Sequence, residues 1–227
     1  MAYELHLALT SILAMPYFKN ENARSGGAVY GHEDAVATKI KEAGFAEEDK
    51  SKYPKLTKGL LKKWAESNDE TELRKATVNM PVGTFILQPA GTQGFPDVLV
   101  KDFTDRFVSI ECKSGKNGVC PMWNDNLPKP TTIYVLASGA RNETTIFMGQ
   151  DVISPEEQAL MNEEEAEIAK IVKKYNQQMA AIDKFNRGFL QKSRRQHFQA
   201  GGGAKTNYFT HASRKQCETN ALEFAKQ

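Results

Sequence analysis

The sequence predicts an α/β protein with a central mixed β-sheet of about five strands, flanking helices and a long C-terminal helix. Two observations support this fold class. Short runs of β-branched and aromatic residues, separated by Gly, Pro, Asn and Asp, fill residues 84–149, a pattern typical of strands. Outside this block, apolar residues recur every three or four positions, which is typical of amphipathic helices. We expect residues 1–150 to form the core and residues 151–227 a helical, basic segment within one compact unit.

The helical periodicity before the strand block predicts three helices and a further short helical stretch. These span residues 3–15, 32–43, 56–66 and 70–75. Pro16 ends the first helix, and Gly44 follows the second as a C-terminal stop. Residues 19–30 are polar and contain glycines, so they are expected to form a loop.

The strand block divides into five segments. They span residues 84–88, 96–100, 106–113, 132–138 and 144–149. The one long break, residues 114–130, contains three prolines and two glycines and therefore predicts a loop rather than a crossover helix.

A long helix is predicted after the strands. Ser154, Pro155 and Glu157 form the pattern of a capping box with proline at the first helical position. The apolar residues that follow have near-heptad spacing to about Gly188, which corresponds to a helix about 50 Å long. A helix of that length is expected to form an arm, a dimer element or both.

Composition limits the possible partners and compartments. The chain has 227 residues and a net charge of only +2, so its total charge indicates no partner. Three widely spaced cysteines argue against a disulfide scaffold or a zinc site and fit a reducing, intracellular compartment, so we expect a cytoplasmic protein. The apolar start is too short to span a bilayer and lacks a basic leader, and no phosphate-cradling glycine loop precedes a helix. We therefore expect neither membrane insertion nor a nucleotide cofactor.

The residues that carry chemistry lie in Phe95 to Lys113, two expected strands joined by a turn. Because side chains alternate along a strand, Glu111 and Lys113 share one face and Cys112 points to the other, towards the core. Antiparallel pairing would bring Asp97 beside Glu111. Two carboxylates and an ammonium at one sheet edge favour a divalent cation, and oxygen ligands suit magnesium or manganese.

This arrangement, Pro96-Asp97 followed after thirteen residues by Glu111-Cys112-Lys113, resembles the PD-(D/E)XK nuclease superfamily, which includes type II restriction endonucleases. The resemblance covers roughly residues 30–150 and implies a restriction-endonuclease-like fold. It implies that Asp97, Glu111 and the Cys112 backbone carbonyl hold Mg²⁺, with Mn²⁺ as a substitute. Lys113 would activate the attacking water.

The resemblance also implies a further carboxylate from the preceding helix. Glu33 is the first candidate and Asp34 the second. Both could equally be first-turn charges that interact favourably with the helix dipole.

A basic segment lies near the C-terminus. No acidic residue occurs between Asp183 and Glu218, and aromatic residues and a triple glycine interrupt the positive charges. Such a segment could line a polyanion groove or could be a solvated basic tail. Its candidate DNA contacts are Lys192, Arg194, Arg195, Lys205 and Arg214. The loop after the motif adds Lys116, Asn117, Asn124 and Asp125, for which turn roles are the alternative.

Together these features predict an Mg²⁺-dependent, sequence-specific double-stranded DNA endonuclease of the type II restriction class. It is expected to act as a two-fold homodimer. The alternatives are a structure-specific recombination or repair nuclease and a non-catalytic DNA-binding protein on a nuclease fold.

Overall fold

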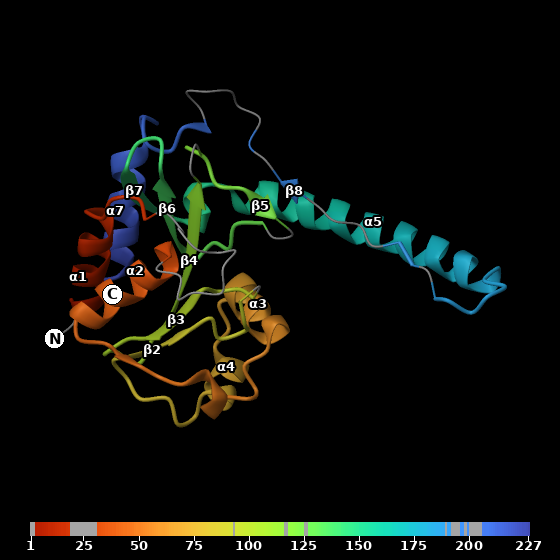
Figure 1. Cartoon of the computed structure of the whole chain (residues 1–227), viewed down its shortest axis with the longest axis horizontal. Helices are drawn as coiled ribbons and strands as arrows, with labels where there is room; N and C mark the ends of the chain where they lie inside the picture. The colour runs from red at the N-terminus through yellow and green to blue at the C-terminus, as the bar shows by residue number, and fades with distance from the viewer. Residues whose placement is uncertain are drawn as a thin grey trace.

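The computed structural model of the chain describes residues 3–18, 31–92, 94–115, 118–124, 127–188, 190–191, 196–197, 199 and 206–227. It has an α/β fold with a six-stranded mixed sheet, helices on both faces of the sheet, and a long helix that projects from the body (Figure 1). The expected fold class is confirmed.

The sheet has the strand order β1-β2-β3-β4-β6-β7. These strands are β1 (Ala46–Glu47), β2 (Thr84–Leu87), β3 (Val98–Lys101), β4 (Phe107–Gly115), β6 (Ile133–Ser138) and β7 (Glu143–Met148). Strands β2, β3 and β4 form an antiparallel meander, β4 and β6 are parallel, and β7 returns antiparallel to β6. All five expected strands are present. The sixth, β1, pairs in parallel with the edge of β2 and has only two residues, too few to show a periodicity.

The connection from β4 to β6 is the predicted loop. Its described residues contain no helix and one short strand, β5 (Trp123–Asn124), which pairs with β8 (Gln196–His197). The segment after the long helix therefore returns to the loop between β4 and β6 and forms a second, two-stranded sheet with it.

Two helical layers cover the sheet because strand residues alternate between its faces (Figure 1). Helices α1 (Glu4–Leu13), α2 (His32–Glu42) and α7 (Arg214–Phe224) lie on one side. Their apolar residues pack with Val98 and Val100 of β3. Helices α3 (Lys58–Ser67) and α4 (Thr71–Ala76) pack with the intervening Leu99 on the other side. The four helical segments expected before the strands are confirmed, and α7 makes the end of the chain part of the core rather than an appendage.

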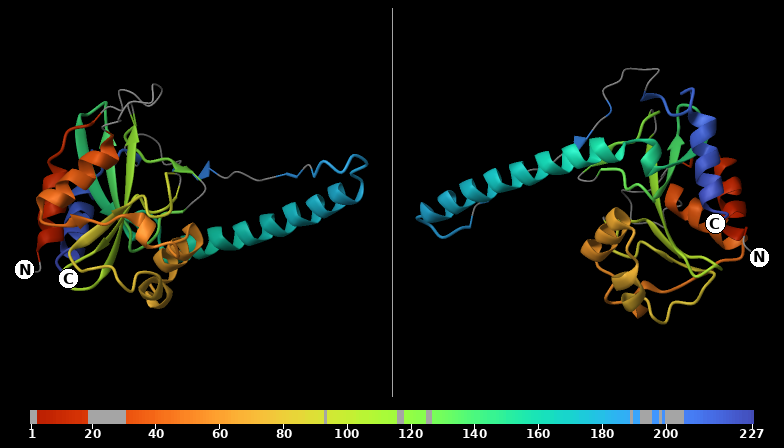
Figure 2. Two further views of the ribbon diagram at one scale, coloured as in Figure 1. Left: turned by 60° about the horizontal axis from the view of Figure 1, so that its bottom comes forward. Right: turned by 180° about the vertical axis from the view of Figure 1, so that it is seen from behind.

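Helix α5 (Pro155–Ala181) extends away from the body and contains no buried residue (Figure 2). The expected capping box is present, with Ser154 Oγ accepting from the Glu157 amide and Glu157 accepting from the Ser154 amide. The helix ends earlier than expected, because the Asp183 carboxylate accepts the backbone N–H groups of Phe185 and Gly188 and holds the chain in a turn. The returning chain then runs back beside the helix, where Asn176 makes two hydrogen bonds of 2.9 Å with the Gln191 backbone.

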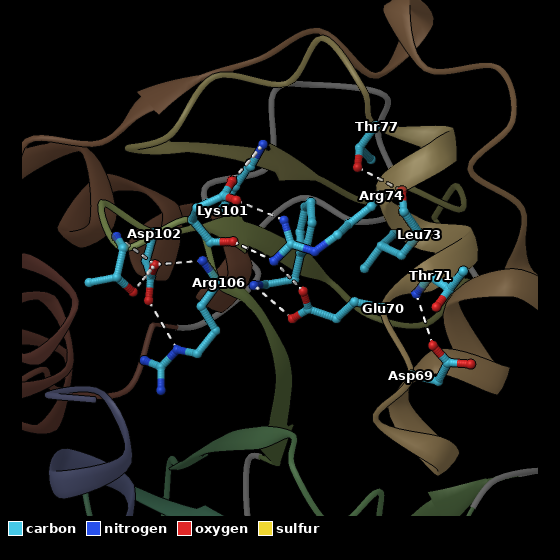
Figure 3. A network of polar contacts seen from close by, with 12 residues as sticks. Asp69, Glu70, Thr71, Leu73, Arg74, Thr77, Lys101, Asp102 and Arg106 are labelled. Atoms are coloured by element: carbon cyan, nitrogen blue, oxygen red, sulfur yellow. Dashed lines mark hydrogen bonds and ion pairs between the residues drawn. The ribbon is translucent and has the colours of Figure 1, made fainter.

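The turn between β3 and β4 is held by a polar network around Asp102 (Figure 3). The buried Asp102 carboxylate accepts the backbone N–H groups of Thr104 (2.9 Å) and Arg106 (3.0 Å), as well as the Arg106 Nε–H (3.1 Å). Arg74 of α4 donates to the carboxylate and the carbonyl of Asp105, a residue with a left-handed φ of 66°. These contacts fix the conformation of the turn and therefore the register of β3 and β4, the strands on either side of it.

We predict that Asp102→Ala lowers the free energy of unfolding by about 2–3 kcal/mol, since it leaves the Arg106 Nε–H and two turn amides without their acceptor. Urea unfolding followed by circular dichroism measures the change. Lys75→Ala is the control, because Lys75 pairs with Glu72 on the exposed surface of α4 and its loss should change stability by less than about 0.5 kcal/mol. Equal effects of the two substitutions would contradict the assignment.

Candidate functional site

The register of β3 and β4 brings the motif residues together. Val98 pairs with Ile110, so the preceding Asp97 lies beside Glu111. The Cys112 backbone N–H donates to Asp97 Oδ2 at 2.7 Å, and Lys113 Nζ donates to Glu111 Oε1 at 2.7 Å. The juxtaposition of Asp97, Glu111 and Lys113 expected from strand geometry is therefore present.

A third carboxylate reaches this cluster from α2. The charge of Glu33 acts on both Asp97 and Glu111, and Glu33 Oε2 accepts a hydrogen bond of 2.8 Å from Gln88 Nε2. Asp34 behaves differently, because its carboxylate accepts the Gly31 backbone N–H and caps its own helix. Of the two candidates from this helix, Glu33 acts electrostatically on Asp97 and Glu111, and Asp34 caps the helix start.

The concentration of negative charge shifts the protonation of the cluster. Burial, then the charges of Glu111 and Glu33, raises the pKa of Asp97 to about 8, although the Cys112 amide and Lys113 oppose the shift. Burial also raises the pKa of Glu111, against the opposing effect of Lys113. At neutral pH, Asp97 therefore holds a proton for a large part of the time when no cation balances the cluster.

The donor set fits a hard divalent cation. Glu111 Oε2 is buried and has no hydrogen-bond partner among the described residues, so a buried oxygen beside Asp97 is left to bind a cation. Within the described part of the chain, no group of three or more His, Cys, Asp or Glu side chains is already arranged for a metal ion. Magnesium commonly binds through one or two carboxylates with water in its other positions, and Asp97 and Glu111 supply that number.

Cys112 and His32 lie beside the cluster and have structural roles. The Cys112 side chain packs against the main core, as the alternation along the strand predicted, and burial raises the pKa of its thiol well above the usual value. Burial also lowers the pKa of His32, with the Val135 backbone opposing the shift, so its imidazole is neutral at neutral pH.

Gln88 contacts the candidate site and lies outside the sequence motif. It follows β2 with a left-handed φ of 46°, its backbone N–H donates to the Asp97 carbonyl at 2.6 Å, and its side chain holds Glu33. It therefore joins α2 to the strand that carries Asp97. No sequence signal indicates this contact, because the two side chains are 55 residues apart.

The structure describes only some of the candidate DNA contacts. Most of them lie outside the described residues: Lys116, Asn117, Asp125, Lys192, Arg194, Arg195 and Lys205. Asn124 lies in β5, opposite Gln196 of β8. The neighbouring Trp123 is buried, and its ring packs edge-on against that of Tyr134.

Arg214 has a structural environment. Its guanidinium donates to Glu218 at 2.7 Å, to Glu143 at 2.9 Å and to the Phe209 carbonyl at 3.0 Å. Glu143 comes from β7 and Glu218 from the next turn of α7. The positive charge of Arg214 is therefore balanced within the fold.

The geometry of the carboxylate cluster is the observation on which a functional proposal for this chain rests. No helix of the described chain is long and apolar enough to cross a membrane. Searches against protein-family models, curated proteins and solved structures give no match to this chain.

We predict that the carboxylate cluster makes stability depend on pH. The pKa of Asp97 is higher in the folded than in the unfolded chain, so the unfolded chain binds fewer protons between about pH 5 and 8. Without divalent cations, the free energy of unfolding should therefore fall as the pH rises through this range. Asp97→Asn should reduce the slope and be the more stable protein at pH 8, as measured by urea unfolding at several pH values.

Asp49→Asn provides the control for this experiment. The Ser51 backbone and side chain lower the pKa of the exposed Asp49, so its titration lies below the range tested. A slope that is the same in Asp97→Asn and the unmodified protein would contradict the raised pKa.

Proposed function

We propose that this protein is an Mg²⁺-dependent endonuclease that hydrolyses phosphodiester bonds of double-stranded DNA at a short specific sequence, as type II restriction enzymes do. The observation that supports it most directly is the cluster of Asp97, Glu111 and Lys113 on two paired strands, with the buried Glu111 Oε2 left without a partner. Buried carboxylates with raised pKa values are typical of functional sites rather than of structural ion pairs.

The residues divide the chemistry among them. Asp97 and Glu111 would hold magnesium, which supplies positive charge to the scissile phosphate and polarises the attacking water. Lys113 Nζ contacts Glu111 Oε1 at 2.7 Å, within the same cluster. Its ammonium can exchange its contact with Glu111 for the charge that develops on the phosphate oxygens.

The cluster accounts for cleavage and not for the choice of sequence. Recognition of bases would need polar side chains in the grooves, and the candidates for it lie in residues 116–126 and 192–205. These segments follow the motif strand and the long helix, and strands β5 and β8 join them. That pairing supports a shared role for the two segments in contacting DNA. A palindromic site would also require two copies of the chain.

We predict that Asp97→Asn, Glu111→Gln and Lys113→Ala each reduce Mg²⁺-dependent cleavage by about 10³-fold or more, since each removes a charge that acts at the phosphate. Digestion of plasmid DNA followed by gel electrophoresis measures the rate. Asp34→Asn should cleave as the unmodified protein does, because Asp34 caps α2 and lies outside the cluster.

The pattern of products separates the related functions. Discrete fragments support a sequence-specific enzyme, whereas cleavage of branched or damaged DNA alone indicates a structure-specific nuclease. Persistence of Mg²⁺-dependent cleavage in both Asp97→Asn and Lys113→Ala would contradict the site. DNA binding without cleavage under any divalent cation would instead indicate a non-catalytic protein.

We also predict that Gln88→Leu weakens Mn²⁺ binding about tenfold, because Glu33 loses the donor that orients its carboxylate towards the cluster. Isothermal titration calorimetry with Mn²⁺ in the absence of DNA gives the Kd without depending on activity. Glu33→Gln should have a similar effect and Asp34→Asn none. An unchanged Kd in both Gln88→Leu and Glu33→Gln would exclude Glu33 from the site.

A further inference from the structure

One face of α5 exposes four large apolar side chains. Leu160, Ile171, Tyr175 and, just past the end of the helix, Ile182 are each more than half exposed. At 100° per residue their directions fall within about 60° of one another around the helix axis. We call these four residues the α5 stripe. Glu164 and Gln178 point in the same range of directions, so polar residues interrupt the stripe. Large exposed apolar side chains that share one direction favour an interaction surface.

The charges along α5 are separated by sign. Glu163, Glu164 and Glu167 lie in its first half, and Lys170, Lys173 and Lys174 in its second half. All six are exposed, and Glu167 and Lys174 point close to the direction of the stripe. Neither of these two makes an ion pair within the described residues. Glu167 and Lys174 therefore place one acidic and one basic charge at the same edge of the stripe, whereas Lys173 points to the opposite side of the helix.

We propose that the α5 stripe pairs with α5 of a second copy, antiparallel about a two-fold axis at Ile171. In such an isologous interface, if residue i meets residue j, then j also meets i. Ile171 would lie against the partner's Ile171, and Leu160 against the partner's Ile182, since both are 11 residues from the axis. Glu167 would lie beside the partner's Lys174, twice over. A parallel pairing would instead place like charges together.

A pocket at the base of the arm fits this pairing. It has a volume of about 300 Å³, and the side chains that form its apolar wall include Trp123, Leu127, Pro128, Val152, Ile153 and Leu160. Leu160, the first residue of the stripe, lines the pocket, so the pocket and the stripe meet. Antiparallel pairing brings the tip of the partner's arm, with the partner's Ile182 and the partner's Phe185, to this position. Both residues are exposed at the tip of their own arm.

A nucleic-acid partner fits this face less well. The stripe is apolar, and the first half of α5 carries the glutamates, which would be repelled by a phosphate backbone. A second copy covers the apolar side chains of the stripe, places Glu167 beside the partner's Lys174 and brings an apolar arm tip to the pocket. The proposal rests on the arm alone and does not require nuclease chemistry at Asp97.

Charge reversal on the full-length protein tests the pairing. In Glu167→Lys, both contacts with Lys174 become positive on both sides, and in Lys174→Glu both become negative. We expect the unmodified protein to be a dimer by sedimentation at micromolar concentration, and each variant to have a Kd for dimerisation raised about tenfold or more. An equimolar mixture of the two variants should restore a heterodimer, because every contact is again between opposite charges.

Matched variants separate this contact from other effects. Ile171→Asp and Phe185→Asp should each weaken the dimer through the axis and the pocket, with helix content unchanged by circular dichroism. Lys75→Glu, which reverses an exposed charge on α4, should leave the mass unchanged. A monomeric unmodified protein, or a mixture that stays monomeric, overturns the proposal. Lys174→Glu that loses DNA binding while the unmodified protein is monomeric would assign the arm to nucleic acid instead.

Discussion

The pairing register of β3 and β4 is the constraint on which the site depends. A shift of one residue would turn Asp97, or Glu111 and Lys113, to the opposite face and expose Cys112 in their place. The register is fixed outside the site, at the turn where Asp102 accepts the amides of Thr104 and Arg106. It is also fixed inside the site, where the Cys112 amide donates to Asp97. A structural carboxylate at one end of the hairpin therefore positions the carboxylates of the candidate site at the other.

Negative charge is balanced by donors at one end of this hairpin and concentrated at the other. At the turn, the Asp102 carboxylate accepts hydrogen bonds from a guanidinium, two backbone amides and a hydroxyl. At the site, the charges of Glu111 and Glu33 act on Asp97, and the ammonium of Lys113 contacts Glu111. Such a cluster reduces the stability of the fold, and it is tolerated where a cation or substrate compensates for it. Protons and divalent cations would compete for Asp97 near neutral pH, so metal binding would be coupled to proton release.

The alternation of residues along the sequence predicted the elements whose structure depends on residues close together in the chain. The five strands followed from alternating β-branched residues, and the Asp97–Glu111 contact followed from strand geometry. The parts that depend on distant contacts were not predicted. Both Glu33 and Asp34 look like first-turn acids, and only the fold shows that Gln88 holds one while the Gly31 amide holds the other. The contact of Arg214 with Glu143 was not predicted either, because Glu143 is far away in sequence and becomes adjacent only through the packing of α7 on β7.

Helix α5 differs from the other helices because the rest of the described chain leaves none of its residues buried. One side is partly covered: Met161, Ile168, Val172 and Met179 are half-buried at heptad spacing, on the side from which Asn176 contacts the returning chain. The α5 stripe lies on the neighbouring side and has no such cover. A helix in water gains most of its stability from packing an apolar face rather than from intrinsic propensity. The returning chain supplies that packing on one side, and a second α5 would supply it on the other.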